Sequence, residues 1–293
     1  MSIWTNRNWT PMLLQEIPKP FNSKDYLYEL KFDGIRAVIF VNKREIKIQS
    51  RNQQDLTNLF PELQEIKKQV TKNVIFDGEI IALRNGLPSF RNIQKRLHLK
   101  NSTKILNASR DNPVVFMAFD ILYENKELIN NNLITRKQYL QKYADSDCFI
   151  KTKAQENNGC ELFRKVKKLG LEGIVAKNKN STYHIDKRTD DFIKIKNIKR
   201  DEFVIGGYEL KKNEQISLAL GEMHNKKLVF VGKVTIRKIN KIYSKILQAN
   251  PSENYFTDFN DNITYIKPTL TCHVEYLERT INNHLRHPIY KDI

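Results

Sequence analysis

Lys31-Phe32-Asp33-Gly34 is a segment whose residue types could perform covalent chemistry. A lysine amine can act as a nucleophile and form a covalent intermediate, and a neighbouring glycine lets the backbone approach a ligand closely. Taken alone, the segment is better explained as a polar turn between two strands, because three fixed residues in four occur readily by chance. Its interpretation therefore depends on charged residues elsewhere in the chain.

Several other charged residues interrupt apolar stretches or stand at their ends. Asp77-Gly78-Glu79 lies within an apolar stretch, although buried charges require partners, and Glu172 directly precedes another such stretch. Lys194 and Lys196 share one face of a strand, because side chains alternate with a period of two. Two further segments belong to this set: Ser50-Arg51-Asn52 and Phe119-Asp120. Cations and carboxylates at strand ends predict a site for a phosphorylated ligand and Mg²⁺.

Short strands with a few helices must position these residues. We expect strands over residues 26–32, 36–41, 45–49, 74–83, 113–122, 173–177 and 191–196, and helices over 60–69, 135–143 and 160–169. The nearly continuous apolar run 113–122 fits a strand buried on both faces. Asn85-Gly86 is expected to form the turn after 74–83, and Gly170 to end the helix before it. This part of the chain is therefore predicted to be α+β with a largely antiparallel sheet.

From residue 199 onward the pattern changes to shorter strands. We expect them over residues 203–210, 215–220, 227–234 and 271–277, with one helix over 238–249. Short strands with a single helix in about 95 residues suit a small β-barrel of the oligonucleotide-binding kind. A domain boundary is expected near residues 197–200.

Composition and charge exclude several classes of protein. The 293 residues suggest two domains, and 40% hydrophobic residues are ample for packed cores. There is no apolar run of membrane-spanning length, and the chain begins without the apolar stretch of a signal peptide. Three cysteines without metal or redox spacing indicate reduced thiols in a cytoplasm. The formal net charge is +17, of which +13 falls before residue 199, so a polyanion such as nucleic acid is the expected partner of both domains.

In this order, the motifs resemble those of the ATP-dependent DNA ligases. Further resemblance lies in Pro11-Met12-Leu13 and Tyr28-Glu29-Leu30 near the start, and in Val274-Glu275-Tyr276 and Leu285-Arg286-His287-Pro288 near the end. They are similar to a minimal two-domain bacterial type, the ligase domain of bacterial end-joining ligases. The resemblance implies an α+β fold: a nucleotidyltransferase (ATP-grasp-like adenylation) domain with mainly antiparallel sheets over residues 1–198. An all-β OB-fold barrel is implied over residues 199–293.

The resemblance also implies a reaction and its residues. Lys31 would attack ATP to give a lysyl-AMP, AMP would pass to the 5′-phosphate of a nick, and the 3′-hydroxyl would displace it. Lys31 would be the AMP acceptor, and Asp33 would assist the reaction or cap the turn. Glu29 would contact the adenine, Phe119 would stack on the purine, and Arg36 and Arg51 would contact the ribose or the 5′-phosphate. Glu79 and Glu172 would contact the metal and nucleotide, Lys194 and Lys196 the α-phosphate, and Arg188 the donor strand. The neighbouring lysines and Mg²⁺ would favour a neutral Lys31 amine.

The resemblance implies ATP and Mg²⁺ as cofactors, with Mn²⁺ as a substitute. The implied substrate is nicked double-stranded DNA, with end-joining or repair proteins as further partners. The protein is expected to be a cytoplasmic monomer with no membrane association. Two alternatives stay open: an RNA ligase or capping-type nucleotidyltransferase, and a catalytically weak nick-binding protein. Repair, end joining, competence and phage replication are equally open as pathways, as is the preferred break type.

Four features depart from the ligase pattern or leave it open. Asp186 stands where glycine is usual, which puts the geometry of the loop before Arg188 in question, and Phe192 replaces tryptophan. Thr235-Ile236-Arg237 replaces a glycine-rich continuation in the barrel. Lys177 is either part of the site or a plain surface lysine. The family's final arginine-containing motif would begin beyond Ile293, which predicts slow self-adenylylation with near-normal sealing of a nick that already carries AMP.

Overall fold

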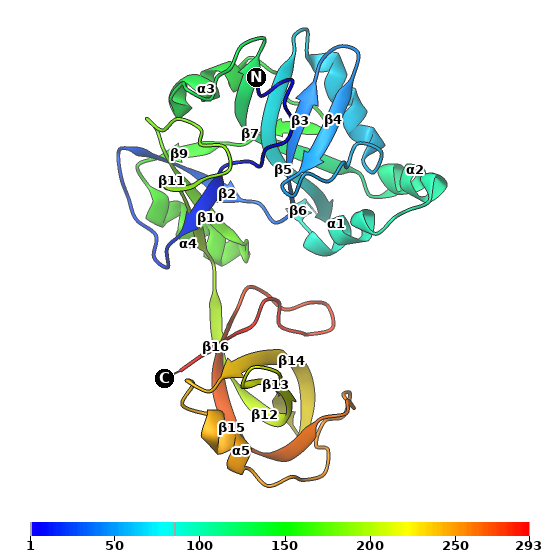
Figure 1. Cartoon of the computed structure of the whole chain (residues 1–293), viewed down its shortest axis with the longest axis vertical. Coiled ribbons are helices and arrows are strands. Elements are labelled where there is room, and N and C mark those ends of the chain that lie inside the picture. Colours follow the sequence, from blue (N-terminus) through cyan, green and yellow to red (C-terminus); the bar gives the residue numbers. More distant parts are fainter. Residues whose placement is uncertain (1, 85, 293) are drawn as a thin grey trace. The chain divides into compact units, whose positions relative to one another are not determined.

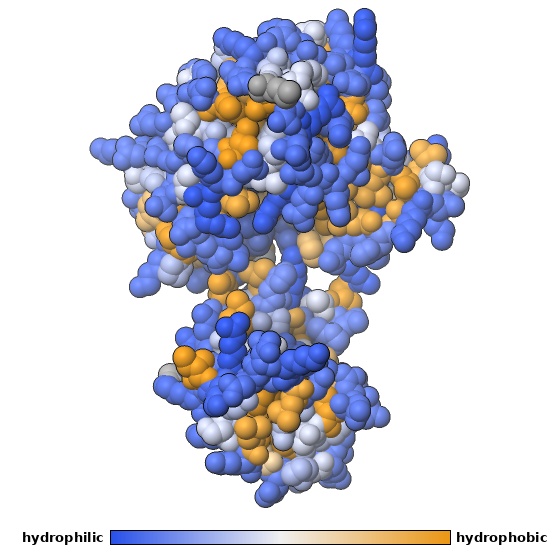
Figure 2. Space-filling model, in the orientation of Figure 1, coloured by the Kyte–Doolittle hydropathy of each residue, from blue (hydrophilic) through white to orange (hydrophobic). Residues whose placement is uncertain are grey.

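The computed structural model describes residues 2–84 and 86–292, which form two compact units (Figure 1). The units comprise Met1–Asn197 and Ile198–Ile293, so the division falls within the range 197–200 expected for the domain boundary and one residue before the implied division after residue 198. Asn85, half of the expected Asn85-Gly86 turn, lies outside the described residues. No helix in the described part of the chain is long and apolar enough to cross a membrane. Hydrophilic side chains cover most of the face seen in Figure 2, in keeping with the high content of charged residues.

The first sheet of the larger unit carries the buried strands. Its order is β4-β3-β5-β7-β8, with β6 paired to β5. The strands are β3 (Ile35–Val41), β4 (Ile46–Ser50), β5 (Val74–Arg84), β6 (Leu87–Pro88), β7 (Val114–Glu124) and β8 (Phe149–Lys151). All but one residue of β7 is buried, which confirms a strand covered on both faces. Its neighbour β5 brings Asp77 and Glu79 into the sheet interior opposite β3.

The second sheet of the larger unit brings distant segments beside one another. Its order is β1-β11-β10-β2-β9. The strands are β1 (Leu13–Glu16), β2 (Tyr26–Lys31), β9 (Ala154–Glu156), β10 (Gly173–Asn178) and β11 (Arg188–Lys196). Only β1 with β11 pairs in parallel here, so this sheet is mainly antiparallel, as predicted. Strand β10 lies between β2 and β11. The end of β2 is therefore next to β10 and two strands away from β11.

Among the described residues of the larger unit, five helices accompany these sheets: η1 (Pro61–Gln69), α1 (Phe90–Leu97), α2 (Ser102–Asp111), α3 (Leu133–Gln141) and α4 (Gly159–Leu169). The expected helix at 60–69 is a 3₁₀ helix, and α1 and α2 were not predicted. Asparagine side chains cap α2 and α3, where Asn101 accepts from the Lys104 N–H and Asn132 from the Thr135 N–H. Gly170 ends α4 with a φ of 67°, as predicted.

The smaller unit is a five-stranded sheet with one short helix. Its order is β14-β13-β12-β15-β16. The elements are β12 (Lys199–Lys211), β13 (Gln215–His224), β14 (Lys227–Arg237), α5 (Tyr243–Gln248), β15 (Thr264–Tyr276) and β16 (Ile289–Lys291). The register shifts at Gly206, and such bulges bend a strand. The strands follow the predicted oligonucleotide-binding barrel, but the expected helix over 238–249 is shortened to α5.

Candidate active site

Lys31 is the last residue of β2, where its side chain meets a carboxylate from the neighbouring strand. It pairs in register with Gly173, and its Nζ lies 2.7 Å from the Glu172 Oε1. Both side chains are largely buried. A Cβ on Gly173 would lie 2.2 Å from the Ile195 carbonyl oxygen, so glycine is what allows β10 to approach β11 here. The predicted nucleophile and the predicted metal carboxylate are therefore direct partners.

Glu79 lies on β5, paired in register with Arg36 on β3. Burial is the largest cause that raises the pKa of the Glu79 carboxyl, Lys31 and Arg36 oppose it, and the Glu172 and Asp77 carboxylates add to it, so that the pKa is about 7. A Cβ on Gly34 would lie 2.2 Å from the Ile80 carbonyl oxygen, so the glycine of the Lys31 motif lets the chain pass close to β5. Lys31, Glu79 and Glu172 thus form one electrostatically coupled group.

Arg36 is held by a fully buried carboxylate. Its Nε and Nη2 donate to the two oxygens of Asp77 at 2.7 and 2.6 Å. The Tyr183 hydroxyl donates to the same carboxylate at 2.6 Å and accepts from the Met12 N–H at 3.0 Å. A bidentate pair of this kind fixes the guanidinium plane. Asp77 therefore orients Arg36 and links it to the segment that leads into β1.

Glu29 sits in a buried cluster of cations. Its oxygens accept hydrogen bonds from the Lys137 ammonium, from Lys177 at 2.9 Å and from the Thr152 hydroxyl at 3.0 Å. Burial opposes ionisation of Glu29, but Lys137 and Lys177 together hold its pKa below the usual value. Burial lowers the pKa of Lys177 to about 8. Lys177 is 3% exposed, so its interpretation as a plain surface lysine is wrong.

Two cationic side chains lie over the ring of Phe119, the expected purine-stacking residue. The Arg36 guanidinium carbon lies 4.4 Å from the ring centroid, and the Lys177 Nζ lies 4.2 Å from it. Cation–π contacts at this range are favourable, more so when desolvated. A purine that stacks on Phe119 has to share the ring with these cations or displace one of them.

Lys194 and Lys196 share one face of β11, as the period-two pattern predicts. Their ammonium groups lie 3.1 and 3.0 Å from the same Glu16 oxygen. Glu16 ends β1 and pairs in register with Lys194. Burial works against ionisation of Glu16, yet hydrogen bonds from Lys196 and Lys194 hold its pKa below the usual value. Glu16 therefore offsets part of the positive charge that the two lysines would offer a phosphate.

A cleft of about 590 Å³ collects most of the predicted site residues. Its lining includes Lys31, Arg36, Arg51, Glu79, Arg188 and Lys194. A smaller cavity of about 40 Å³ shares Lys31, Arg36 and Glu79 with it and adds Glu29, Phe119 and Lys177. The smaller cavity has room for a few water molecules, so a purine would enter only after a side chain moves. Lys31 is one of four residues that line both cavities, with Leu14, Arg36 and Glu79.

The remaining predicted residues lie around this centre. Arg51 is exposed in the turn after β4, and its N–H donates to the Arg36 carbonyl. Arg188 begins β11 and donates to the Leu14 carbonyl. Glu172 contacts Lys31, which lines the cleft. Lys196 shares its partner Glu16 with Lys194, which also lines the cleft. Asp33 lies in the connection between β2 and β3 and is not part of either cavity lining.

Asp186 adopts the left-handed backbone conformation that glycine favours, with a φ of 60°. Its carboxylate accepts hydrogen bonds from the Thr10 N–H at 2.5 Å and the Thr10 hydroxyl at 2.6 Å, and its own N–H donates to the Thr10 carbonyl. Aspartate tolerates this conformation better than most residues. The aspartate thus keeps a glycine-like loop and ties it to the segment that lines the cleft.

Replacing Asp186 tests this interpretation. Asp186→Gly should lower the free energy of unfolding by about 1 kcal/mol, because the hydrogen bonds to Thr10 are lost. Asp186→Ala should cost about 2 kcal/mol, because alanine is also strained at this φ. Urea denaturation of the three proteins measures both differences. Equal stabilities of the three proteins would show that the hydrogen bonds between Asp186 and Thr10 do not stabilise the fold.

Several residues of the site carry no signal in the sequence. Glu16 and Lys137 lie in elements without a recognisable motif, and they meet their partners only through the sheet order. Asp77 did carry a signal, because a carboxylate in an apolar strand requires a partner. That partner is Arg36, expected at a ribose or phosphate. The neighbouring Asp120 is likewise buried, paired with Arg136 at 2.8 Å.

The carboxylates of this site fit a magnesium ion that also binds the phosphate of a substrate. No group of three or more histidine, cysteine or acidic residues suitable for a metal occurs within residues 2–84 and 86–292. Glu172 pairs with Lys31, and the Glu79 carboxyl lies near enough to both for their charges to interact. Magnesium commonly takes one or two carboxylates and completes its shell with water and substrate phosphates. These two residues are compatible with that mode of binding.

Two family models match the chain. Residues 11–196 match the ATP dependent DNA ligase domain, and residues 211–293 match the ATP dependent DNA ligase C terminal region. The chain is 29% identical to the SPbeta prophage-derived DNA ligase-like protein LigB of Bacillus subtilis, covering 96% of this chain and 97% of that protein. It is also 29% identical to the multifunctional non-homologous end joining protein LigD of Mycolicibacterium smegmatis, of which it spans 38%.

Solved structures show the same architecture. A mycobacterial DNA ligase D complexed with ATP and MES aligns with a TM-score of 0.59 at 26% identity, over 97% of this chain and 94% of that one. A Lig E DNA ligase aligns with a TM-score of 0.65 at 18% identity, over 95% and 98% of the two chains, and supports the fold alone. The predicted pairing of a nucleotidyltransferase domain with an oligonucleotide-binding barrel is confirmed.

Proposed function

The chain belongs to the ATP-dependent DNA ligase family, and on that basis we propose that Lys31 carries AMP from ATP to a DNA nick. The observation that supports this assignment is that Lys31 lines both cavities and pairs with Glu172 at 2.7 Å. Neither the RNA-directed alternative nor the nick-binding alternative gains support from the family models. The substrate is therefore ATP together with DNA.

The reaction proceeds in three transfers. The Lys31 amine attacks the α-phosphorus of ATP, a phosphoramidate bond forms, and pyrophosphate leaves. The 5′-phosphate of the nick then attacks the same phosphorus and releases the lysine. Finally, the 3′-hydroxyl attacks the activated 5′-phosphate, the phosphodiester forms and AMP leaves. Lys31 must leave its ion pair with Glu172 and lose a proton before the first transfer, since only the neutral amine is a nucleophile.

The chain's own groups prepare these transfers. Lys194 and Lys196 offer positive charge to the α-phosphate, and Arg36 stays oriented by Asp77. Glu29 and Phe119 border the smaller cavity, which we assign to the adenine ring. Glu79 and Glu172 would hold Mg²⁺, or Mn²⁺ in its place. When bound, the metal supplies positive charge that stabilises the developing charge on phosphate oxygens.

Contacts with DNA involve exposed cations of the cleft. Arg51 and Arg188 line it, and a guanidinium suits bidentate phosphate contact. A monomeric state and a cytoplasmic location are carried over from the sequence as proposals. The chain spans about two fifths of the LigD end-joining protein, so repair and end-joining partners are carried over as proposals only.

The direct test is sealing of a nicked duplex with ATP and Mg²⁺, with each component omitted in turn. We expect joined product only when all three are present, and the same assay on blunt and cohesive ends ranks the break types. A nicked RNA duplex serves as the comparison substrate. Absence of joined DNA under all conditions would refute the proposed function.

Glu172→Ala should reduce the rate of self-adenylylation by ~100-fold, the lower end of the loss seen when a group that serves the transition state is removed. The matched control is Glu65→Ala, because Glu65 is an exposed carboxylate that pairs only with Lys68 among the described residues. Rates are measured with α-labelled ATP over a range of Mg²⁺ and Mn²⁺ concentrations. Equal rates and equal metal dependence in both variants would contradict the metal role of Glu172.

A further inference from the structure

Helices α1 and α2 carry a concentration of positive charge that the proposed mechanism does not use. The two helices and the turn between them carry six cationic side chains and a single carboxylate, Asp111 at the end of α2. Five of the six are exposed: Arg91, Lys95, Lys100, Lys104 and Arg110. None of the five forms an ion pair with another described residue. Cations left without carboxylate partners on a folded surface are free to contact an external anion.

The sixth cation, Arg96, is buried and fastens the two helices to the rest of the unit. Its Nη1 and Nη2 donate to the Glu62 carboxylate at 2.6 and 3.1 Å. The same groups donate to backbone carbonyls of Leu59, Ala108 and Asn112. One guanidinium therefore joins η1, α1 and the end of α2. The exposed cations are presented on a fixed support rather than on a loose loop.

Helix α1 also connects this surface to the active-site cleft. Phe90 and Leu97, at its two ends, line the cleft that contains Lys31. Arg91 and Lys95 are four residues apart and exposed, so they occupy one face of the helix. Arg91 directly follows Phe90 at the cleft. At 3.6 residues per turn, this face of α1 differs from the one that carries Phe90 and Leu97. Arg91 and Lys95 would therefore meet only a polyanion that extends beyond the cleft, such as the duplex that flanks a nick.

We propose that α1, α2 and the turn between them bind the phosphate backbone of the DNA duplex beside the nick. This inference rests on the proposed ligase function, because the nick must lie at Lys31 for the helices to meet the flanking duplex. Their role is to position the substrate: the five cations contact phosphates and take no part in the transfers of AMP. Such contacts hold the register of a duplex without reading its sequence.

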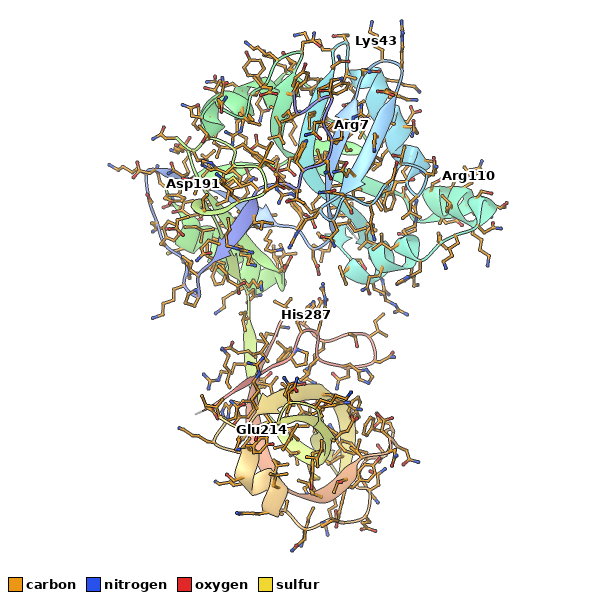
Figure 3. The ribbon with its side chains drawn as sticks, viewed as in Figure 1. Arg7, Lys43, Arg110, Asp191, Glu214 and His287 are labelled. Carbon is orange, nitrogen blue, oxygen red and sulfur yellow. The ribbon has the colours of Figure 1, made fainter. Side chains whose placement is uncertain are left out.

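The test uses two charge-reversal pairs in the larger unit. Arg91→Glu with Lys95→Glu removes two cations of α1, and Lys43→Glu with Arg44→Glu changes the net charge equally at the exposed β3–β4 turn. Figure 3 shows Lys43 and Arg110 at separate edges of this unit. Affinity for a labelled nicked duplex without a 3′-hydroxyl is measured from 50 to 200 mM salt. Self-adenylylation with ATP alone is measured in parallel.

Each lost phosphate contact should lower the log–log salt slope by about 0.9, so the α1 pair should lower it by about 2. The unaltered protein should bind the duplex more tightly than the α1 pair, and the ratio of the two affinities should be roughly tenfold larger at 50 mM than at 200 mM salt. Self-adenylylation should stay within about twofold, because ATP does not reach these side chains. The β3–β4 pair should leave the slope nearly unchanged.

Three results would overturn the proposal: an unchanged slope in the α1 pair, an equal loss in the β3–β4 pair, or normal binding when the substitutions are glutamine. The glutamine pair, Arg91→Gln with Lys95→Gln, decides the matter if glutamates disturb the fold, since it should still lower the slope by about 2. Failure of the underlying function would look different, because the unaltered protein would then not form a lysyl-AMP at all.

Discussion

Lys31→Ala should reduce the protein-bound label from α-labelled ATP to background and abolish sealing of an ordinary nick. The Lys31 amine supplies the nitrogen that forms the phosphoramidate, so the variant has no atom in that position to accept AMP. Label is measured on denatured protein, where a lysyl-AMP is released by acid. Label that persists in Lys31→Ala would identify a different acceptor.

Two controls separate loss of the nucleophile from damage to the site. Removing Lys31 also leaves the largely buried Glu172 without its ion-pair partner, which is costly in itself. Lys31→Arg keeps a cation beside Glu172, but a guanidinium stays protonated and is no nucleophile, so label should again be absent. Both variants should still seal a nick that already carries 5′-AMP, because that step needs no acceptor on the protein. Loss of this last activity would show that the whole site had collapsed.

The strand framework could be predicted because its signals are local. The apolar run that became β7 and the glycine that ends α4 follow directly from side-chain size and backbone freedom. Helix α1 was missed because it is only eight residues long. Helix α2 was missed because it buries no side chain, and Arg96 holds it through hydrogen bonds instead. A single buried arginine has no periodic pattern that a sequence could reveal.

The charged motifs gave the identities of the site residues, but not their partners. Lys31 and Glu172 were predicted separately, and their ion pair depends on β10 lying next to β2. Glu16 joins the site only because β1 lies parallel to β11. Lys137 reaches Glu29 from α3, more than a hundred residues further along the chain. Pairings of this range follow from the sheet order, which short motifs do not encode.

Glu79 is a site residue whose ionised form lowers the stability of the folded protein. Its carboxyl is partly buried near Glu172 and Asp77, and its pKa of about 7 lies above the ordinary value of 4.5. Between these two pH values the folded protein retains a proton that the unfolded chain releases. The stabilising contribution of this proton is fully present below pH 4.5 and is lost as the pH rises through 7. Above pH 7 the folded state holds a charge that it disfavours.

Glu79→Gln should therefore make the protein more stable and much less active. At pH 8 without metal, the free energy of unfolding should rise on the order of 3 kcal/mol, because 2.5 units of pKa correspond to that energy. Near pH 4.5 the two proteins should unfold alike, since Glu79 is then neutral in the folded state. Urea titrations in EDTA at both pH values measure this difference. Self-adenylylation should fall ~100-fold, as expected when a group that serves the transition state is removed. A variant that is destabilised at pH 8 would mean that attraction to Lys31 and Arg36 outweighs burial, and that Glu79 is an ordinary structural ion-pair partner.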